Sequence, residues 1–551
     1  MRISKLESER GMAALVALLL VGMLTIIGLA ALSTSNDEVQ VAGNQLQETQ
    51  AFYAAESGLD AAVATLEAHY DTANTTPTVM PSGSQSLNNC TVTYNTVDNG
   101  AATFKVLNFG SLSGLHALVK SFSLASTGSG SSHDASVTLR ETFQASLVPL
   151  FQFAVFYNND LEIAPGADMN VIGRVHTNGN LYLQSDNGLE MNSFVTAAGS
   201  LFHGRKGPGG TGTGDVQAKN GVGTLMSMKN TDGTWLDSNY PKWYDSSLAR
   251  WNGRVEDKSM GVLPMNLPLS TSGDPHKLIE PAAGGNTDSY ENQASLKFID
   301  NKAYQLQTGV WTDVTATMTA LGIITYSPNK FTDAREGKSV DVTDLDLTKL
   351  QANGYWPSND IVYFSQTVTA GADFPALRLT NGATLPAPLT VASANPVYTL
   401  GDFNKNTKKS ASILSDAFTI LSNSWAAGGY DALGGASQSS RPASNTTVNV
   451  AYATGNVNTT STNYNGGFEN LVRFLENWSS RTLTWTGSAI CLWNSLQAIG
   501  NWNGTYYTPP TRNWSYDTAF DDPNNLPPGT PTVRTFQRVG WSQDNIGYAG
   551  N

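Results

Sequence analysis

Charged side chains are scarce in this chain of 551 residues. They make up 14% of it, against roughly 25% in a typical soluble domain. Asn, Thr, Ser and 51 Gly take their place, a composition typical of an exported, turn-rich β protein. Basic residues are the scarcer kind, and the formal net charge of −13 would repel the phosphates of nucleic acids. We therefore expect no nucleic-acid partner.

Cysteine is almost absent as well. The two cysteines, Cys90 and Cys491, exclude a dense disulfide scaffold and a four-cysteine zinc site. In an oxidising compartment they are candidates for one disulfide, which would close a very long loop and restrict the unfolded chain. Two free thiols are the alternative.

Catalytic motifs are also missing from the sequence. It contains no Gly-x-Ser-x-Gly elbow, His-Glu-x-x-His helix or phosphate loop with Gly-Lys-Ser/Thr. The six histidines are scattered, and His176 beside an Asn-Gly turn is interpreted as a structural residue. Asp341, Asp344 and Asp346 lack the glycine and closing glutamate of a calcium loop, which favours helix capping. We expect no enzyme, no cofactor and no bound metal.

A long apolar run stands near the N-terminus. Met12 to Leu32 are 21 consecutive uncharged positions, which as a helix reach roughly 31 Å, enough to cross a bilayer core. Arg2, Lys5 and Arg10 precede the run, so its N-terminal side is expected in the cytoplasm. A signal peptide is the alternative, but its apolar core is only about 7–15 residues long. We expect a single pass through the inner membrane, with the rest of the chain outside.

The helical pattern continues beyond the apolar run. No proline occurs between Met12 and Tyr70, which permits one helix over residues 12–70. In its second half apolar side chains recur at spacings of three and four, whereas acidic ones follow another stripe. The first half suits lipid and the second half suits a folded head.

These N-terminal residues resemble a known family. Glu9 to Val16, the apolar run, Val41 to Asn44 and Ala54 to Leu59 occur in the order found in the N-terminal region of PilX-type minor pilins of the type IV pilus. The resemblance covers about the first 70 residues.

The resemblance implies a processing site and partners. Residues 1–11 would be a leader that prepilin peptidase removes after Gly11, leaving Met12 as a methylated N-terminus. The mature helix would pack with the major pilin and other minor pilins. Most pilins have Glu at the fifth mature position, where this chain has Val16, a feature shared with PilX-type and some pseudopilin members. The apolar positions of the expected filament helix are Leu15, Val16, Leu18, Leu19, Leu20, Ile26, Ile27 and Leu29.

The rest of the chain is expected to be rich in β structure. Alternating segments separated by Asn-Gly and Gly-Ser turns predict a small antiparallel sheet over residues 71–149. Beyond residue 150, short strands broken by Gly and Asn favour a parallel β-helix-like solenoid over residues 150–551, with an insertion at about 204–375. A β-sandwich is the alternative. The expected fold class is α+β and mainly β.

The large region has a resemblance of its own. Phe153 to Tyr157, Gly173 to Asn180, Arg473 to Trp478 and Pro527 to Pro531 are similar to segments of large uncharacterised pilus-associated proteins that begin with a PilX-type segment. This resemblance implies no activity. It suggests that residues 150–551 form one unit.

Aromatic residues are concentrated in the last quarter of the chain. Tryptophans surrounded by Asn, Thr and Ser could hold sugar rings or a partner at the host or another surface, although packing in the core is the simpler interpretation. The candidates for such a ligand face are Trp478, Trp485, Trp493, Trp502 and Trp514.

Three functions follow from these observations. The first is a minor pilin or pseudopilin that acts in filament initiation and presents a large tip domain for adhesion. The others are a surface protein anchored outside any filament and a polysaccharide-cleaving enzyme on a β-helix. A type IV pilus and a type II secretion system are not distinguished.

Overall fold

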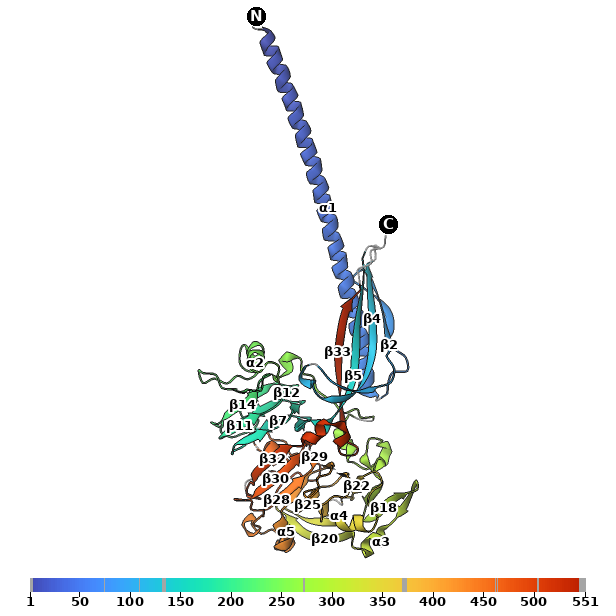
Figure 1. The fold of residues 1–551 in the computed structure, drawn as a ribbon, viewed down its shortest axis with the longest axis vertical. Coiled ribbons are helices and arrows are strands. Elements are labelled where there is room, and N and C mark those ends of the chain that lie inside the picture. The colour runs from blue at the N-terminus through green and yellow to red at the C-terminus, as the bar shows by residue number, and fades with distance from the viewer. Residues whose placement is uncertain are drawn as a thin grey trace.

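The computed structural model describes residues 3–73, 75–108, 110–130, 135–270, 273–368, 374–460, 462, 464–502 and 505–544, with the side chains of the first helix from residue 11 onward. The start of the expected leader, residues 1 and 2, lies outside this part. A long helix leads to a sheet that packs on its second half, and a larger β domain lies beyond that sheet (Figure 1). The expected fold class, mainly β after a long N-terminal helix, is confirmed.

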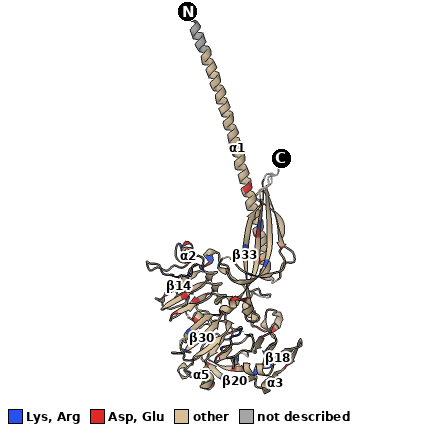
Figure 2. Ribbon diagram, viewed as in Figure 1, with Lys and Arg blue, Asp and Glu red and all other residues tan. Residues whose placement is uncertain are grey.

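Helix α1 (Ile3–Thr72) runs without interruption for 70 residues, so the one helix that the sequence permits over 12–70 is present and begins earlier, within the expected leader. Residues 11–42 are exposed on all sides, and burial of one face begins near residue 51. Residues 11–36 carry no charged side chain, and Figure 2 shows the described ribbon of this exposed part in tan.

The second half of α1 packs on an antiparallel sheet, the head sheet. Its strands follow the order β1-β2-β4-β5-β33, and β3 pairs with β4. The predicted antiparallel pairing is present, but the last strand of the head sheet comes from the C-terminal end of the chain. The expected unit over 150–551 therefore needs correction, because β33 pairs with β5 and belongs to the head. The strands are β1 (Ser82–Leu87), β2 (Cys90–Asp98), β3 (Thr103–Val106), β4 (His116–Gly130), β5 (Ser136–Pro149) and β33 (Thr532–Gln543).

The helix approaches the head sheet closely. Ala55, Leu59 and Leu66 are buried against Phe122 and Phe143 of the sheet. These positions lie on the apolar stripe that the sequence predicts, and burying them stabilises the helix on the head.

The large domain begins with coils of 20 residues. Val155, Val175 and Val195 are register partners in neighbouring parallel strands. Two further parallel stacks follow the first one at the same interval, so each coil contributes one strand to each of three stacks. The strands of this half are β6 (Val155–Tyr157), β7 (Leu161–Ile163), β8 (Met169–Val171), β9 (Val175–Thr177), β10 (Leu181–Leu183), β11 (Gly188–Met191), β12 (Val195–Ala197), β13 (Leu201–His203), β14 (Asp215–Lys219), β15 (Leu225–Ser227) and β16 (Val255–Glu256).

The second half of the large domain extends the first stack. In the first stack the order is β16-β12-β9-β6-β31-β29-β26-β24-β22-β17, with β18 and β19 added antiparallel at the end. The chain therefore enters in the middle at β6, runs to β16, crosses to the far end through residues 257–295, and returns to the middle at β31. This topology brings both ends of the large domain back to the head. The strands of the extended first stack are β17 (Leu296–Ile299), β18 (Lys302–Gln307), β19 (Val310–Asp313), β22 (Ile361–Ser365), β24 (Leu389–Ser393), β26 (Ala411–Ser415), β29 (Ala451–Thr454) and β31 (Ala489–Cys491).

Two shorter sheets complete this half. One has the order β20-β21-β23-β25-β27 and the other β28-β30-β32. Because β14, β17, β21 and β22 all lie in the stacks, the segment expected as an insertion at 204–375 is not a separate insertion. The strands are β20 (Ile324–Asp333), β21 (Lys338–Asp346), β23 (Pro375–Thr380), β25 (Val397–Leu400), β27 (Phe418–Leu421), β28 (Thr446–Asn449), β30 (Thr482–Gly487) and β32 (Thr511–Tyr516), and the short helices are α2 (Trp243–Trp251), α3 (Thr315–Ala320), α4 (Leu347–Ala352) and α5 (Asn423–Ala427).

Candidate functional site

The exposed half of α1 is the first candidate site. Every apolar residue predicted for the filament helix is at least half exposed, from 51% for Val16 to 75% for Leu18. Among the described residues α1 is the one helix long and apolar enough to cross a membrane. Such a surface is unfavourable in water, so lipid or neighbouring helices must cover it. The residues concerned are Leu15, Val16, Leu18, Leu19, Leu20, Ile26, Ile27 and Leu29.

The predicted processing site lies within the same helix. Gly11 and Met12 are both exposed, and a Cβ on Gly11 would meet no atom within 4 Å. The fold therefore leaves this peptide bond accessible, and packing does not explain why residue 11 is a glycine.

The two cysteines lie in different cores and are free. Cys90 is buried on β2 beside Ala54 and Val92, whereas Cys491 is buried on β31 in the large domain. The expected Cys90–Cys491 disulfide is thus contradicted, because each thiol belongs to a separate packed cluster.

The five candidate tryptophans do not form one face. Trp478 and Trp493 are buried in the core, with exposed fractions of 0% and 4%, and Trp502 is half-buried. Trp485 and Trp514 come together, with ring centroids 5.7 Å apart. These two line the second candidate site.

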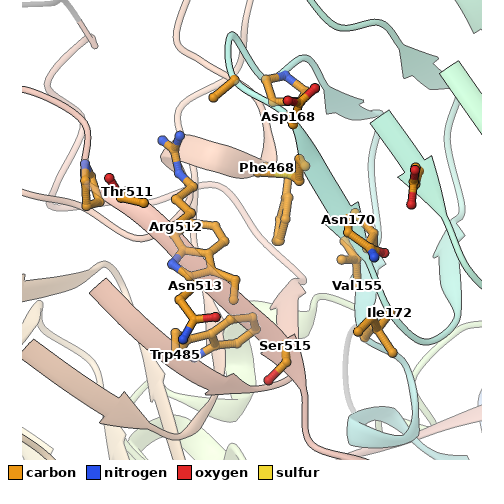
Figure 3. Close-up of a pocket in the computed structure, with 18 of the residues that line it drawn as sticks. Val155, Asp168, Asn170, Ile172, Phe468, Trp485, Thr511, Arg512, Asn513 and Ser515 are labelled. Atoms are coloured by element: carbon orange, nitrogen blue, oxygen red, sulfur yellow. The ribbon is translucent and has the colours of Figure 1, made fainter. Parts of the chain in front are cut away.

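This second site is a cavity of about 830 Å³ between residues 165–172 and 509–516, which we call the β8–β32 notch. Figure 3 shows Asp168 and Asn170 on one wall and Thr511 and Asn513 on the other, with Phe468 between them. At this level the first stack is continuous through β6 and β31. In the described chain, however, no ladder of hydrogen bonds joins β8 to β32. The notch is the gap between these two strand edges.

Local sequence explains why the edges separate. Pro165 stands before β8, and Pro509 and Pro510 stand before β32. Proline has no backbone N–H to donate, so pairing cannot continue past these positions. At the other end the walls meet, because a Cβ on Gly173 would lie 3.0 Å from the Tyr516 ring.

Buried polar groups lie at and behind the notch. The Trp514 Nε1 and Arg512 Nε groups are buried and have no hydrogen-bond partner among the described residues. Behind them, Glu469 accepts a hydrogen bond from the Ala164 N–H at 2.5 Å. Burial raises the pKa of Glu469 to about 7, although the Arg512 charge opposes that shift.

The other polar residues singled out in the sequence have structural roles. His176 lies on β9, where its ring nitrogens contact Thr196 at 2.8 Å and Asn178 at 3.0 Å, and burial lowers its pKa to about 4. Asp346 caps α4 by accepting from the Lys349 N–H, as expected. No group of three or more His, Cys, Asp or Glu in the described chain is placed to hold a metal.

Sequence reasoning missed most of the notch. Asp168 and Asn170 come from one segment, and Phe468, Arg512 and Asn513 come from segments almost 300 or more residues later. Their meeting depends on β6 pairing with β31. One signal was present: Pro509 and Pro510 come directly before β32, and proline is typical of the edge of a sheet.

Comparison with known proteins supports the interpretation of the N-terminus. Residues 10–60 match the family model described as PilX N-terminal. One similar solved structure is that of the competence-associated pilin ComZ from Thermus thermophilus, at 13% identity and a TM-score of 0.31, covering 91% of this chain and 98% of that chain. No match was found among curated proteins. Residues 10–60 of this chain are thus similar to the PilX N-terminal family, and a large β domain follows the head sheet.

Proposed function

We propose that this protein is a PilX-like minor pilin or pseudopilin that is processed after Gly11 and joins a type IV pilus or a related secretion filament. The observation that carries this proposal is the division of α1. Residues 11–36 are uncharged and exposed, and the second half of the helix is fixed to the head sheet. A helix of this kind can leave the membrane and enter a bundle of similar helices without any change in the head.

The same helix supports anchoring before assembly. Lys5 and Arg10 precede the apolar run, so the positive-inside rule places the N-terminus in the cytoplasm and the head outside the inner membrane. The partners in this proposal are prepilin peptidase, the major pilin and other minor pilins. After assembly the protein would be exposed on the pilus or cell surface.

The large domain would form a single β-helix-like solenoid. Support comes from the in-register parallel pairing that continues through both halves and across the β6–β31 junction. Such a stacked domain is rigid and presents a long surface, which suits a role in adhesion.

Size favours a position at the filament tip or another rare position. About 480 residues lie outside α1, and compact-domain scaling gives a radius of gyration near 23 Å. Packed helices in a filament are only about 8–10 Å apart. Neighbouring subunits of a shaft could not all carry such a domain.

Val16 is the second reason for a tip position. In pilins that carry Glu at the fifth mature position, that carboxylate would neutralise the terminal amine of a neighbouring subunit inside lipid, where an unpaired charge is costly. Val16 cannot do so. A subunit at the tip, with no subunit above it, loses nothing by this substitution, and it could initiate the filament.

Replacement of the glycine at the cleavage site tests this proposal. We expect intact-mass measurement of the membrane-extracted protein to give a chain that begins at a methylated Met12. Gly11→Leu should retain the leader, whereas Gly22→Leu, a matched change within the same exposed helix, should be processed normally. A wild-type chain that still begins at Met1 would refute the assignment as a processed pilin.

A further inference from the structure

The β8–β32 notch lies between the sheet that contains β8 and the sheet that contains β32. Phe468 and Trp485 are 3% and 5% exposed and form its base, and Trp514 covers them from β32. The Phe468 and Trp514 rings are 5.7 Å apart in an edge arrangement. In a complete stack a further strand would pair with the edge of β32, but among the described residues β32 is the last strand of its sheet.

We propose that this notch binds a neutral oligosaccharide. The proposal rests on the surface-exposed role proposed above, and it identifies the ligand class and the residues of the adhesive site. Trp514 would provide the apolar platform for a sugar ring, and the polar groups of the two walls would bind its hydroxyls.

The size and lining of the notch fit such a ligand. Its volume of about 830 Å³ lies within the range of roughly 300–1,000 Å³ typical of small-molecule sites. Asn170 and Asn513 are exposed on opposite walls. The Asn170 amide oxygen accepts from Asn192 and the Asn513 amide nitrogen donates to Thr484, so the Asn170 nitrogen can still donate and the Asn513 oxygen can still accept. Hydroxyl groups, which also donate and accept, are matched by this arrangement.

The charges at the rim favour a neutral sugar over an acidic one. Asp168 and Glu190 line the same cavity as Arg512. With two carboxylates beside one guanidinium, an anionic sugar would meet net repulsion. The carboxylates can instead accept hydrogen bonds from neutral hydroxyls.

An extended peptide added as a strand is the competing ligand. It would need backbone donors along both edges, and three positions that precede the two strands, Pro165, Pro509 and Pro510, have none. At the narrow end Tyr516 and Gly173 are in contact distance, which leaves no width for a further strand. The geometry therefore favours the sugar.

Calorimetry on the full-length protein in detergent tests the proposal. The probes are cellohexaose, mannohexaose, xylohexaose and chitohexaose, with hexagalacturonate as the anionic comparison. We expect at least one neutral hexasaccharide to bind with a Kd below about 1 mM, and hexagalacturonate to bind at least tenfold more weakly.

Matched variants locate the binding. Trp514→Ala and Asn513→Ala should each weaken it at least about tenfold. Trp311→Ala, on exposed β19, and Asn95→Ala, on the head sheet, should leave it unchanged. Because Asn513 is exposed, Asn513→Ala should fold normally. Its effect on binding can therefore be measured even if Trp514→Ala disturbs folding.

Three results would overturn the inference: no neutral hexasaccharide binds, binding survives Asn513→Ala, or a hexapeptide selected from a random library occupies the notch instead. Leader cleavage and recovery in filaments are measured on the same proteins. If these succeed while sugar binding fails, only the notch assignment is wrong. If sugar binds to a chain that is never processed, the pilin proposal is wrong and the notch assignment stands.

Discussion

Single glycines determine how closely the helix and the head sheet can approach. Gly128 on β4 faces the backbone of α1, and a Cβ at this position would lie 2.1 Å from the Ala51 carbonyl oxygen. The sequence places Gly128 in a Gly/Ser-rich stretch that suits a turn, and only the packed structure reveals the contact. The requirement for glycine at this position comes from a neighbour about 80 residues away in the sequence, so the local sequence pattern cannot predict it.

We predict that Gly128→Ala destabilises the head by about 2 kcal/mol or more, because the close contact is to backbone, which cannot rotate away. Gly130→Ala, on the same strand, should cost little, since its Cβ would be 3.8 Å from the nearest atom. Denaturant unfolding of both variants measures the difference. Equal stabilities would show that the helix does not dock as described.

Two buried carboxyl groups make stability depend on pH. Burial raises the pKa of Glu469 and of Glu476 to about 7, despite hydrogen bonds and nearby arginines that favour the charged forms. In the unfolded chain these groups ionise near their ordinary value of 4.5. The folded state therefore holds extra protons between those values, and its stability falls as pH rises from about 4.5 through 7.

The free energy of unfolding should fall less between pH 5 and 8 in Glu469→Gln than in the wild type, by up to about 3 kcal/mol. Glu56→Gln, at an exposed position of α1, is the control and should leave the slope unchanged. Unfolding curves at several pH values provide the measurement. If the free energy of unfolding of Glu469→Gln depended on pH as in the wild type, Glu469 would not be buried in its protonated form.

At the scale of elements, β33 is the feature least visible in the sequence. It is the last strand of the chain and completes the sheet that residues 82–149 begin. Phe536 stacks on Phe143 at 5.5 Å, and Arg538 pairs with Glu141 of β5 and Asp60 of α1. Alternation predicts that β33 is a strand but not which sheet it joins, because pairing between distant segments depends on tertiary packing.

Arg538→Ala should destabilise the head by about 2 kcal/mol, because Glu141 would remain buried without its partner. Arg140→Ala on β5 is the matched control, since its partner Asp544 is exposed and such pairs contribute less than about 1 kcal/mol. Thermal unfolding of the two variants tests how much β33 stabilises the head. A larger loss of stability for Arg140→Ala than for Arg538→Ala would contradict a stabilising role of the Arg538 pairs.

The sequence predicts that the first half forms coils of short strands, but it does not predict how many coils there are. Val155, Val175 and Val195 recur at an exact interval, followed each time by leucine six residues later at Leu161, Leu181 and Leu201. The second half lacks a fixed interval because its coils carry additional segments of different lengths, such as the one that contains β20. Variable loops hide a repeat whose strands still pair in register.

At the scale of the whole molecule, the large domain is built into the head. The chain leaves the head through β5 and returns through the adjacent β33. Arg174 of the large domain also donates to the Ser111 and Ser113 carbonyls of the head. Two neighbouring connections and these contacts should make the two parts move together, which would let the head position the notch relative to the filament.

Gold labelling of the large domain on purified filaments tests its placement. Because of crowding in the shaft, we expect label at filament ends or at rare sites. Regular label along the shaft, with one domain for each subunit, would contradict the tip proposal.

The central claim is that the exposed half of α1 becomes part of a filament. The most direct measurement is the intact mass of this protein recovered from sheared, purified filaments. We predict a chain that begins at methylated Met12 and is present in far fewer copies than the major pilin. Recovery of the protein only from membranes, with residues 1–11 still attached, would contradict the account.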